Sequence, residues 1–431
     1  MSISVDVYLL SGKSASMEVE PDASVESLKH RAQSELAVPR FALLLNSSGE
    51  VLDRAHTVTE AKLRSGDVLT LHVNPVQVQL HATTSAFAAL LSDGSVVTWG
   101  NAGCGGDSSA VQHQLRDVQQ IQASFGAFAA IRGDGSVVTW GNAVRGGDSG
   151  AAQDQLKNVQ QIQASGAAFA AIRGDGSVVT WGDARFGGDS RAVPDQLRDV
   201  QQIQASYGAF AAIRGDGAVV TWGDAAGGGD SSVVQDQLQD VQQIQASDFA
   251  FAAIRGDGSV VTWGDACNGG DSSAVQDQLR DVQQIQASSG AFAAVLGDGS
   301  VVTWGDACNG GDSTVVQDQL RDVQQIQASE YAFAAILSDG SVVTWGDACF
   351  GGNSTAVQNQ LRDVQQIQAS GQAFAAILGD GSVVSWGRAD DGGDSSAVQA
   401  MFCTSGTGKH EPQKGRVVQL ETIATIAGAM T

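Results

Sequence analysis

Residues 1–74 and residues 76–402 follow two different patterns of apolar and polar positions. In the first part, apolar and polar residues alternate over residues 4–10, a Ser-Gly-Lys turn follows at 11–13, and a second alternating run ends at Val19. Alternation with a period of two places every other side chain on the same face of a strand, and a short glycine-containing turn reverses the chain. The pattern therefore predicts a β-hairpin at the start of the chain.

A helix is expected after this hairpin. Ser24 is a suitable N-cap because its hydroxyl can accept a hydrogen bond from an unpaired N–H group of the first helical turn. Val25, Leu28 and Ala32 are spaced so that they share one face of a helix. Two further apolar runs complete a sheet that this helix can cover, which predicts a small α+β domain.

The second pattern is a repeat with a period of 41 residues. Each copy contains three short runs typical of strands, which read QQIQAS for strand A, AFAAIRG for strand B and SVVTWGD for strand C, or close variants of these words. An Asp-Gly pair between B and C fits a tight hairpin turn, because glycine readily adopts positive φ angles. The eight tryptophans of the chain occupy one position of strand C in each copy, namely Trp99, Trp140, Trp181, Trp222, Trp263, Trp304, Trp345 and Trp386.

A unit of three strands cannot bury both of its faces alone. Repeats of about forty residues, each with an Asp-Gly turn and a Trp at fixed positions, are typical of blades arranged radially around an axis. We therefore expect an all-β propeller of eight blades over residues 76–402. Each Trp should be a packing element between neighbouring blades, because a large aromatic side chain buries much apolar surface.

The words LLSGKSASMEVEPDASVESLKHRAQ and TVTEAKLRSGDVLTLHV give residues 1–74 a resemblance to the ubiquitin family. The resemblance implies a β-grasp fold and a docking surface that includes Leu10, Leu44 and Leu69. The alternative is that the leucines at 43–45 are all core residues. The di-glycine terminus of the family is absent, since the last strand runs into Asn74-Pro75-Val76. Docking to ubiquitin-receptor domains, without conjugation, is therefore the expected role of this domain.

The word DGSVVTWG, which follows an alanine-rich strand, resembles the repeats of the regulator-of-chromosome-condensation family and its compact relatives with three-stranded blades. Family members commonly have seven blades, so a seven-bladed ring is the alternative to eight. The combination with a ubiquitin-like domain is similar to HERC-like proteins. Residues 403–431 are expected to be a tail, and their Val-Gln-Leu word at 418–420 repeats the word at 78–80, which makes it a candidate ring-closing strand.

Two positions vary most among the otherwise similar copies: the turn between strands A and B, and the loop after strand C. Because strand direction alternates, both positions should lie on one rim of the propeller. A variable rim on a constant scaffold is typical of a binding surface, although neutral drift of exposed loops is the alternative. The aromatic and Arg side chains expected to bind a protein partner there are Phe125, Arg145, Arg185, Phe186, Tyr207, Phe249, Tyr331 and Phe350.

Composition excludes several kinds of protein. With 47 acidic against 24 basic residues and a formal charge of -23, the chain is a poor candidate for binding nucleic acid, since phosphate contacts need Lys or Arg. No apolar run reaches the ~20 residues of a membrane span, and no secretory signal is evident, so a soluble intracellular protein with reduced cysteines is expected. The six histidines form no metal-ligand or catalytic pattern, so we expect no enzyme activity, cofactor or metal.

These observations lead to one functional hypothesis and two alternatives. We expect a non-enzymatic adaptor of the ubiquitin system, in the cytoplasm or the nucleus, that joins the ubiquitin-like docking module to a second protein held by the propeller. The propeller resemblance makes nucleotide exchange on a small GTPase the first alternative. A substrate-recognition component related to HERC-type ubiquitin ligases is the second.

Overall fold

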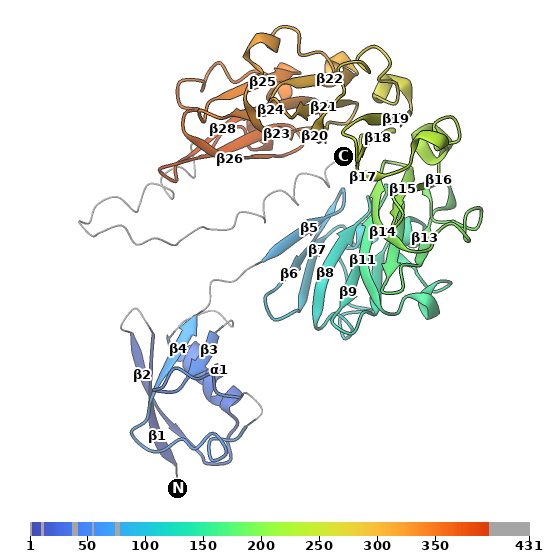
Figure 1. Ribbon diagram of the computed structural model, residues 1–431. Helices are drawn as coiled ribbons and strands as arrows, with labels where there is room; N and C mark the ends of the chain where they lie inside the picture. Colours follow the sequence, from blue (N-terminus) through green and yellow to red (C-terminus); the bar gives the residue numbers. More distant parts are fainter. Residues whose placement is uncertain (1, 10–12, 37–41, 54–55, 74–77, 396–431) are drawn as a thin grey trace. The chain divides into compact units, whose positions relative to one another are not determined.

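The computed structural model describes residues 2–9, 13–36, 42–53, 56–73 and 78–395 (Figure 1). It divides into two compact units, one of Met1–Val78 with Leu91–Asp93 and one that starts at Gln79. Leu10 and the predicted tail at 403–431, with its candidate ring-closing strand, lie outside the described residues.

The first unit has the predicted order of hairpin, helix and two further strands. Its sheet has the order β2-β1-β4-β3, in which β1 pairs with β2 in antiparallel fashion and with β4 in parallel fashion. The parallel pairing of the first and last strands, with the helix between them in sequence, gives a β-grasp fold. The elements are β1 (Ile3–Tyr8), β2 (Ser14–Val19), α1 (Val25–Leu36), β3 (Ala42–Leu45) and β4 (Val68–Val73).

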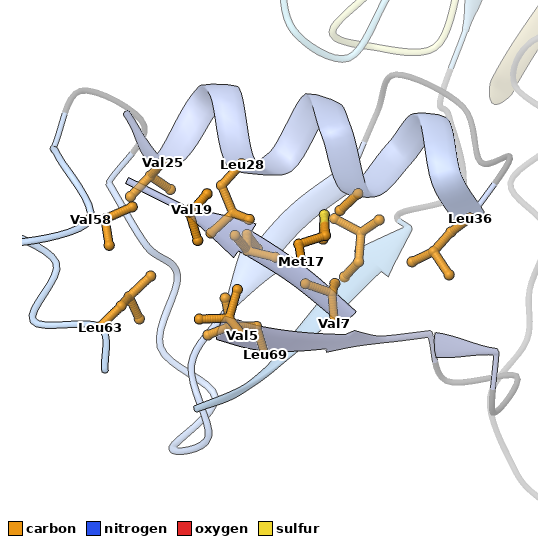
Figure 2. Packing of buried hydrophobic residues seen from close by; sticks show 13 residues of the cluster. Val5, Val7, Met17, Val19, Val25, Leu28, Leu36, Val58, Leu63 and Leu69 are labelled. Atoms are coloured by element: carbon orange, nitrogen blue, oxygen red, sulfur yellow. The ribbon is translucent and has the colours of Figure 1, made fainter. Parts of the chain in front are cut away.

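Helix α1 covers one face of this sheet, and the core lies between the two (Figure 2). The helix begins as predicted, because the Ser27 N–H donates to Ser24 Oγ at 3.2 Å. Leu28 and Leu36 face inward-pointing strand residues such as Val5 and Met17, and all four are fully or almost fully buried. The apolar stripe of the helix and the alternation of the strands therefore meet in a single core.

The second unit contains eight three-stranded sheets, one for each sequence copy, which confirms eight blades rather than seven within the described residues. In each sheet the predicted strand B is central and pairs with A and C in antiparallel fashion. Blades 1–4 comprise β5 (Gln79–Ala82), β6 (Ala86–Leu90) and β7 (Val96–Gly100); β8 (Val118–Ala123), β9 (Ala127–Arg132) and β10 (Val137–Gly141); β11 (Val159–Ala164), β12 (Ala168–Arg173) and β13 (Val178–Gly182); and β14 (Val200–Ala205), β15 (Ala209–Arg214) and β16 (Val219–Gly223).

Blades 5–8 repeat the same arrangement. They comprise β17 (Val241–Ala246), β18 (Ala250–Arg255) and β19 (Val260–Gly264); β20 (Val282–Ala287), β21 (Ala291–Leu296) and β22 (Val301–Gly305); β23 (Val323–Ala328), β24 (Ala332–Leu337) and β25 (Val342–Gly346); and β26 (Val364–Ala369), β27 (Ala373–Leu378) and β28 (Val383–Gly387). Short helical turns follow strand C at Ala102–Cys104, Ala143–Gly147, Ala184–Phe186, Ala225–Gly229, Ala266–Asn268, Ala307–Asn309, Ala348–Phe350 and Ala389–Asp391, and others lie at Gln153–Gln155, Gln235–Gln237 and Gln317–Gln319.

The blades are arranged around a common axis with strand A innermost. The A strands of successive blades contact one another, as β8, β11 and β14 do. The ends of all eight A strands line one cavity. Between neighbouring blades lies an apolar core, in which the small alanines of one strand B, such as Ala86 and Ala88, pack against Ile121 and Phe128 of the next blade.

A tryptophan joins each blade to the one before it. Trp140 of blade 2 stacks on Phe128 of its own blade with ring centroids 5.1 Å apart, and its indole N–H donates to the carbonyl of Gly105 in blade 1 at 3.0 Å. Gly105 has a φ of +97°, and a Cβ there would lie 2.6 Å from the Phe128 ring, so this position requires glycine. The same indole hydrogen bond and ring stacking recur in blades 3–8.

Trp99 departs from the prediction that every Trp is packed between two blades. It stacks on Phe87 of its own blade, yet 44% of its surface is exposed, against 3% to 5% for the other seven tryptophans. The reason is its place in the chain, because blade 1 has no preceding blade in sequence to supply the glycine carbonyl.

Replacing one of the buried tryptophans should strongly destabilise the propeller. Trp222 is 3% exposed and donates to the Gly187 carbonyl, so Trp222→Ala removes a large core side chain and leaves a buried acceptor unpaired. We expect a loss of about 3 to 5 kcal/mol in the free energy of unfolding, measured by chemical denaturation. Val233→Ala, at a position that is 94% exposed, is the control and should cost less than about 0.5 kcal/mol. Equal losses in the two variants would contradict this packing.

Candidate functional site

The two variable positions share one rim of the propeller, as the alternation of strand direction predicted. In blade 2 the hydroxyl of Ser124, at the end of strand A, donates to the carbonyl of Arg145 in the loop after strand C at 2.8 Å. The N–H of Asn142 in the same loop donates to the carbonyl of Gly126 in the A–B turn, also at 2.8 Å. Equivalent bonds in the other blades, such as Ser165 Oγ to the Phe186 carbonyl, hold both segments together.

The first residue of each A–B turn belongs to a continuous chain of backbone hydrogen bonds around the axis. The N–H of Phe125 donates to the carbonyl of Gly166, that of Gly166 to Tyr207, and that of Tyr207 to Asp248, at 2.8 to 3.0 Å. Only backbone atoms form this chain, so the side chains are free to differ from blade to blade. We call these residues the inner ring: Thr84, Phe125, Gly166, Tyr207, Asp248, Ser289, Glu330 and Gly371.

The inner ring borders the axial cavity, whose volume is about 410 Å³. Seven of its eight residues line this cavity, together with the Ala and Ser residues that end the A strands. None of the lining residues is Lys, Arg or His. The cavity mouth is therefore built from the most variable positions of the repeat and carries acidic and aromatic groups without a cation.

Three of the predicted aromatic residues gather around a fourth, Tyr207, although the four come from four different blades. The ring centroids of Phe125, Phe186 and Phe249 lie 5.3 Å, 5.4 Å and 5.4 Å from the centroid of Tyr207. The separations and the edge-on or tilted angles are those of favourable aromatic pairs. Tyr207 is itself 38% exposed, so this aromatic cluster presents a face to solvent.

The other predicted rim residues do not join the aromatic cluster. Tyr331 and Phe350 form a separate edge-on pair with centroids 4.4 Å apart. Arg185 is exposed and makes an ion pair with Asp183 of its own loop at 2.7 Å. Arg145 is also exposed. Its side chain lies against Gly126 of the A–B turn, since a Cβ added at Gly126 would be 2.9 Å from Arg145 Cδ. Both Arg side chains therefore lie on the rim, as predicted.

The sequence did not single out the two acidic residues of the inner ring. Burial raises the pKa of Asp248 to about 6, against the opposing effect of its hydrogen bond with Ser289. Burial also raises the pKa of Glu330 to about 7, with further contributions from the negative charges of Asp248 and Asp391. Glu330 Oε1 is buried and accepts no hydrogen bond. The sequence repeats show that Asp248 and Glu330 occupy variable positions. Their burial could not be predicted, because it arises only when the blades come together in the inner ring.

The proposed docking residues of the ubiquitin-like domain need correction. Leu44 is 2% exposed and Leu69 is 1% exposed, and both belong to the core beneath α1, so neither side chain is available to a partner in the folded domain. The opposite face of the sheet is the accessible one. Tyr8 on β1 and Val68 on β4 are 40% and 47% exposed there. Strand parity could have shown this, because Leu69 and Leu71 alternate with the outward Val68.

Other chemistry is sparse among the described residues. No cluster of three or more His, Cys, Asp or Glu side chains is placed to hold a metal in this part of the chain. Cys104, Cys267, Cys308 and Cys349 are free thiols. Within the same ranges, no helix has the length and apolar character needed to cross a membrane.

Comparison with known proteins finds a family model that matches the first unit. The model of the ubiquitin family matches residues 3–76. A solved ubiquitin of Caldiarchaeum subterraneum matches with 19% identity and a TM-score of 0.17, covering 18% of this chain and 98% of that chain. No curated protein matches the chain.

Solved propellers resemble the second unit. Yeast RCC1 (Prp20) in complex with Kap60 matches with 14% identity and a TM-score of 0.40, covering 74% of this chain and 80% of that chain. The ectodomain of the receptor kinase CR4 from Physcomitrella patens matches with 15% identity and a TM-score of 0.37, covering 63% and 73%.

Leu44 provides a direct test of the corrected core. Leu44→Asp places a charge in the core under α1 and should unfold the ubiquitin-like domain, seen as loss of the dispersed signals of that domain in NMR spectra. Val68→Asp, at a position that is 47% exposed, is the matched control and should leave the spectrum folded. A folded Leu44→Asp domain would show that this side chain is accessible after all.

The raised pKa of Glu330 predicts a pH dependence of stability. A folded-state pKa of about 7, above the ordinary 4.5, means that the folded chain binds the proton more tightly than the unfolded chain. The contribution of this carboxyl to stability is therefore complete below pH 4.5 and is lost as the pH rises to 7. Between pH 5 and pH 8, melting temperatures of the native chain should fall relative to those of Glu330→Gln. Parallel profiles of the two proteins, with Val315→Ala as a non-titrating control, would contradict the assignment.

Proposed function

We propose that this chain is a non-enzymatic adaptor that holds one protein on the rim of its propeller and docks to the ubiquitin system through its ubiquitin-like domain. The observation that carries the proposal is the aromatic cluster. Its members come from variable positions of four blades, and yet the fold brings them into contact around one half-exposed tyrosine. Clustered aromatic side chains are the residues that most often dominate the energy of protein interfaces.

The charge of the cavity mouth suggests the chemistry of the partner. Asp248 and Glu330 line a cavity that has no basic lining residue, and Glu330 Oε1 lacks a hydrogen-bond donor. A Lys or Arg side chain would supply that donor, and its aliphatic stem could pack on Tyr207, where a cation–π contact is also favourable. The proposed partner therefore presents a basic side chain to the mouth, next to apolar groups that cover the aromatic cluster.

The second half of the proposal concerns the ubiquitin-like domain. Its accessible sheet face carries Tyr8 and Val68, while the predicted Leu44 and Leu69 are core residues. We propose that this outer face, rather than those leucines, contacts ubiquitin-receptor domains. The two units then provide separate binding sites within one chain, in the cytoplasm or the nucleus.

Substitution of Tyr207 tests the rim. Affinity capture with the intact chain should retain a partner that Tyr207→Ala loses, because the central aromatic contributes about 2 kcal/mol and its loss weakens binding roughly thirtyfold. Val315→Ala, at a position that is 94% exposed, is the control and should retain the same partner. Glu330→Gln should weaken capture of a partner that inserts Lys or Arg. Unchanged capture by Tyr207→Ala would contradict the rim site, and accelerated nucleotide release from a small GTPase would favour an exchange factor instead.

The ubiquitin-like domain requires its own test. Pull-down of receptor-type ubiquitin-binding domains by the intact chain should be weakened by Val68→Asp, which adds a charge to the outer sheet face without disturbing the core. Tyr207→Ala is the control, since it lies in the other unit. Equal pull-down by all three proteins would contradict docking through this face.

A further inference from the structure

Gly371 is an inner-ring residue whose backbone conformation does not require glycine. Its φ lies outside the left-handed region, unlike that of the glycines in the turns between strands B and C. The equivalent positions of six other blades carry Thr, Phe, Tyr, Asp, Ser or Glu in the same chain of backbone hydrogen bonds. A side chain is therefore compatible with this position of the fold, and the reason for a glycine lies in its surroundings.

The carboxyl group of Glu330, from the preceding blade, occupies the space beside Gly371. A Cβ added at Gly371 would lie 3.1 Å from Glu330 Cδ and closer still to Oε1, so the two could not coexist without a shift of the carboxyl group. The Glu330 N–H donates to the Gly371 carbonyl at 2.9 Å, which holds the two residues side by side. Glu330 Oε1 is buried in this place and accepts no hydrogen bond. The missing side chain of Gly371 thus gives room to a buried, unpaired acceptor.

The groups that face Glu330 add negative charge. Burial raises the pKa of Glu330, and the carboxyl groups of Asp248 in blade 5 and Asp391 in blade 8 raise it further. Tyr331 lies next to Glu330 in blade 7, and burial and the charge of Glu330 raise the pKa of its hydroxyl. A cation at the cavity mouth would relieve this repulsion.

The cation nearby in blade 8 is engaged elsewhere. The guanidinium of Arg388 forms an ion pair with Asp391 at 3.3 Å and donates to Gln372 Oε1 at 2.7 Å. Among the described residues that line the axial cavity, none is Lys, Arg or His. The cation that would pair with Glu330 therefore has to come from a bound molecule.

We propose that Gly371 is a positioning residue of the rim site, which seats the Glu330 carboxyl group in the cavity mouth so that it binds the ammonium or guanidinium group of the partner. The inference rests on the proposed function for the identity of that basic side chain. A carboxyl group pairs with a cation in its ionised form, so a protonated Glu330 releases its proton to solvent as the cation enters. Binding of the basic group therefore strengthens as the pH rises through the pKa of Glu330.

Titration of Glu330 in the intact chain tests this binding. Glu330 is the only glutamate of residues 76–402, so its carboxyl signal can be assigned in NMR spectra of a chain with isotope-labelled glutamate, by comparison with Glu330→Gln. In the native chain this carboxyl should titrate with a pKa of about 7. Addition of ~100 mM n-butylammonium, which mimics a Lys side chain, should lower this pKa by at least about 0.5 relative to the same concentration of sodium chloride. The same titration with n-propylguanidinium distinguishes an Arg from a Lys side chain as the partner group.

Gly371→Ala tests the positioning role. The added methyl group should move the carboxyl group out of the mouth, because the end of a flexible side chain shifts more easily than the backbone. The pKa of Glu330 should then fall toward its ordinary value of 4.5 and no longer respond to n-butylammonium. Gly166→Ala is the matched control at the inner-ring position of blade 3. The side chain beside Gly166 is the Phe125 ring, so Glu330 should titrate in this variant as in the native chain.

Two results would overturn the proposal. The first is a Gly371→Ala chain in which Glu330 titrates as in the native chain, or which no longer folds, because the glycine then does not act by seating this carboxyl group. The second is a native pKa that n-butylammonium leaves unchanged. Both are distinct from failure of the proposed function, which is partner capture that Tyr207→Ala does not weaken, because the titration of Glu330 requires no partner.

Discussion

The propeller depends on one contact, in which the tryptophan of a blade donates its indole N–H to a glycine carbonyl of the preceding blade. The bond length is 3.0 Å in all seven blades that follow another blade. The stacked phenylalanine and the positive φ of the glycine belong to the same arrangement, since the ring lies where a Cβ would be. Together they fix the orientation of each blade on its neighbour by both a polar bond and apolar burial.

This scaffold explains why the rim can vary without loss of the fold. The inner ring is joined by backbone N–H and carbonyl groups. The A–B turn is held to the loop after strand C by a hydroxyl, which belongs to Thr83 in blade 1 and to a Ser such as Ser124 in blades 2–8. None of these bonds uses the variable side chains. The propeller can therefore present two aromatic residues, two carboxyl groups and two glycines at equivalent positions of its inner ring.

Much of the propeller fold could be predicted from the sequence, because the 41-residue period indicates where each strand, turn and tryptophan lies. The shared rim followed from strand direction alone. The gathering of Phe125, Phe186 and Phe249 around Tyr207 could not be predicted, because it depends on how far each blade is rotated from the next. The exposure of Trp99 was missed because one prediction was applied to all eight tryptophans, although blade 1 has no preceding blade in sequence. The error at Leu44 and Leu69 has a different cause, since these residues were chosen by resemblance to ubiquitin, whereas the alternation of Leu69 and Leu71 with Val68 already indicated the buried face.

The residues that build the scaffold and those of the proposed binding surface are separate sets. The most direct measurement is to place the Gly166-Ala167 dipeptide at the A–B turn of all eight blades and to compare melting temperature and partner capture with the native chain. We expect a melting temperature within a few degrees of the native value and loss of the partner. A partner retained by this folded variant, or a propeller that no longer folds, would show that the two sets of residues are not separate.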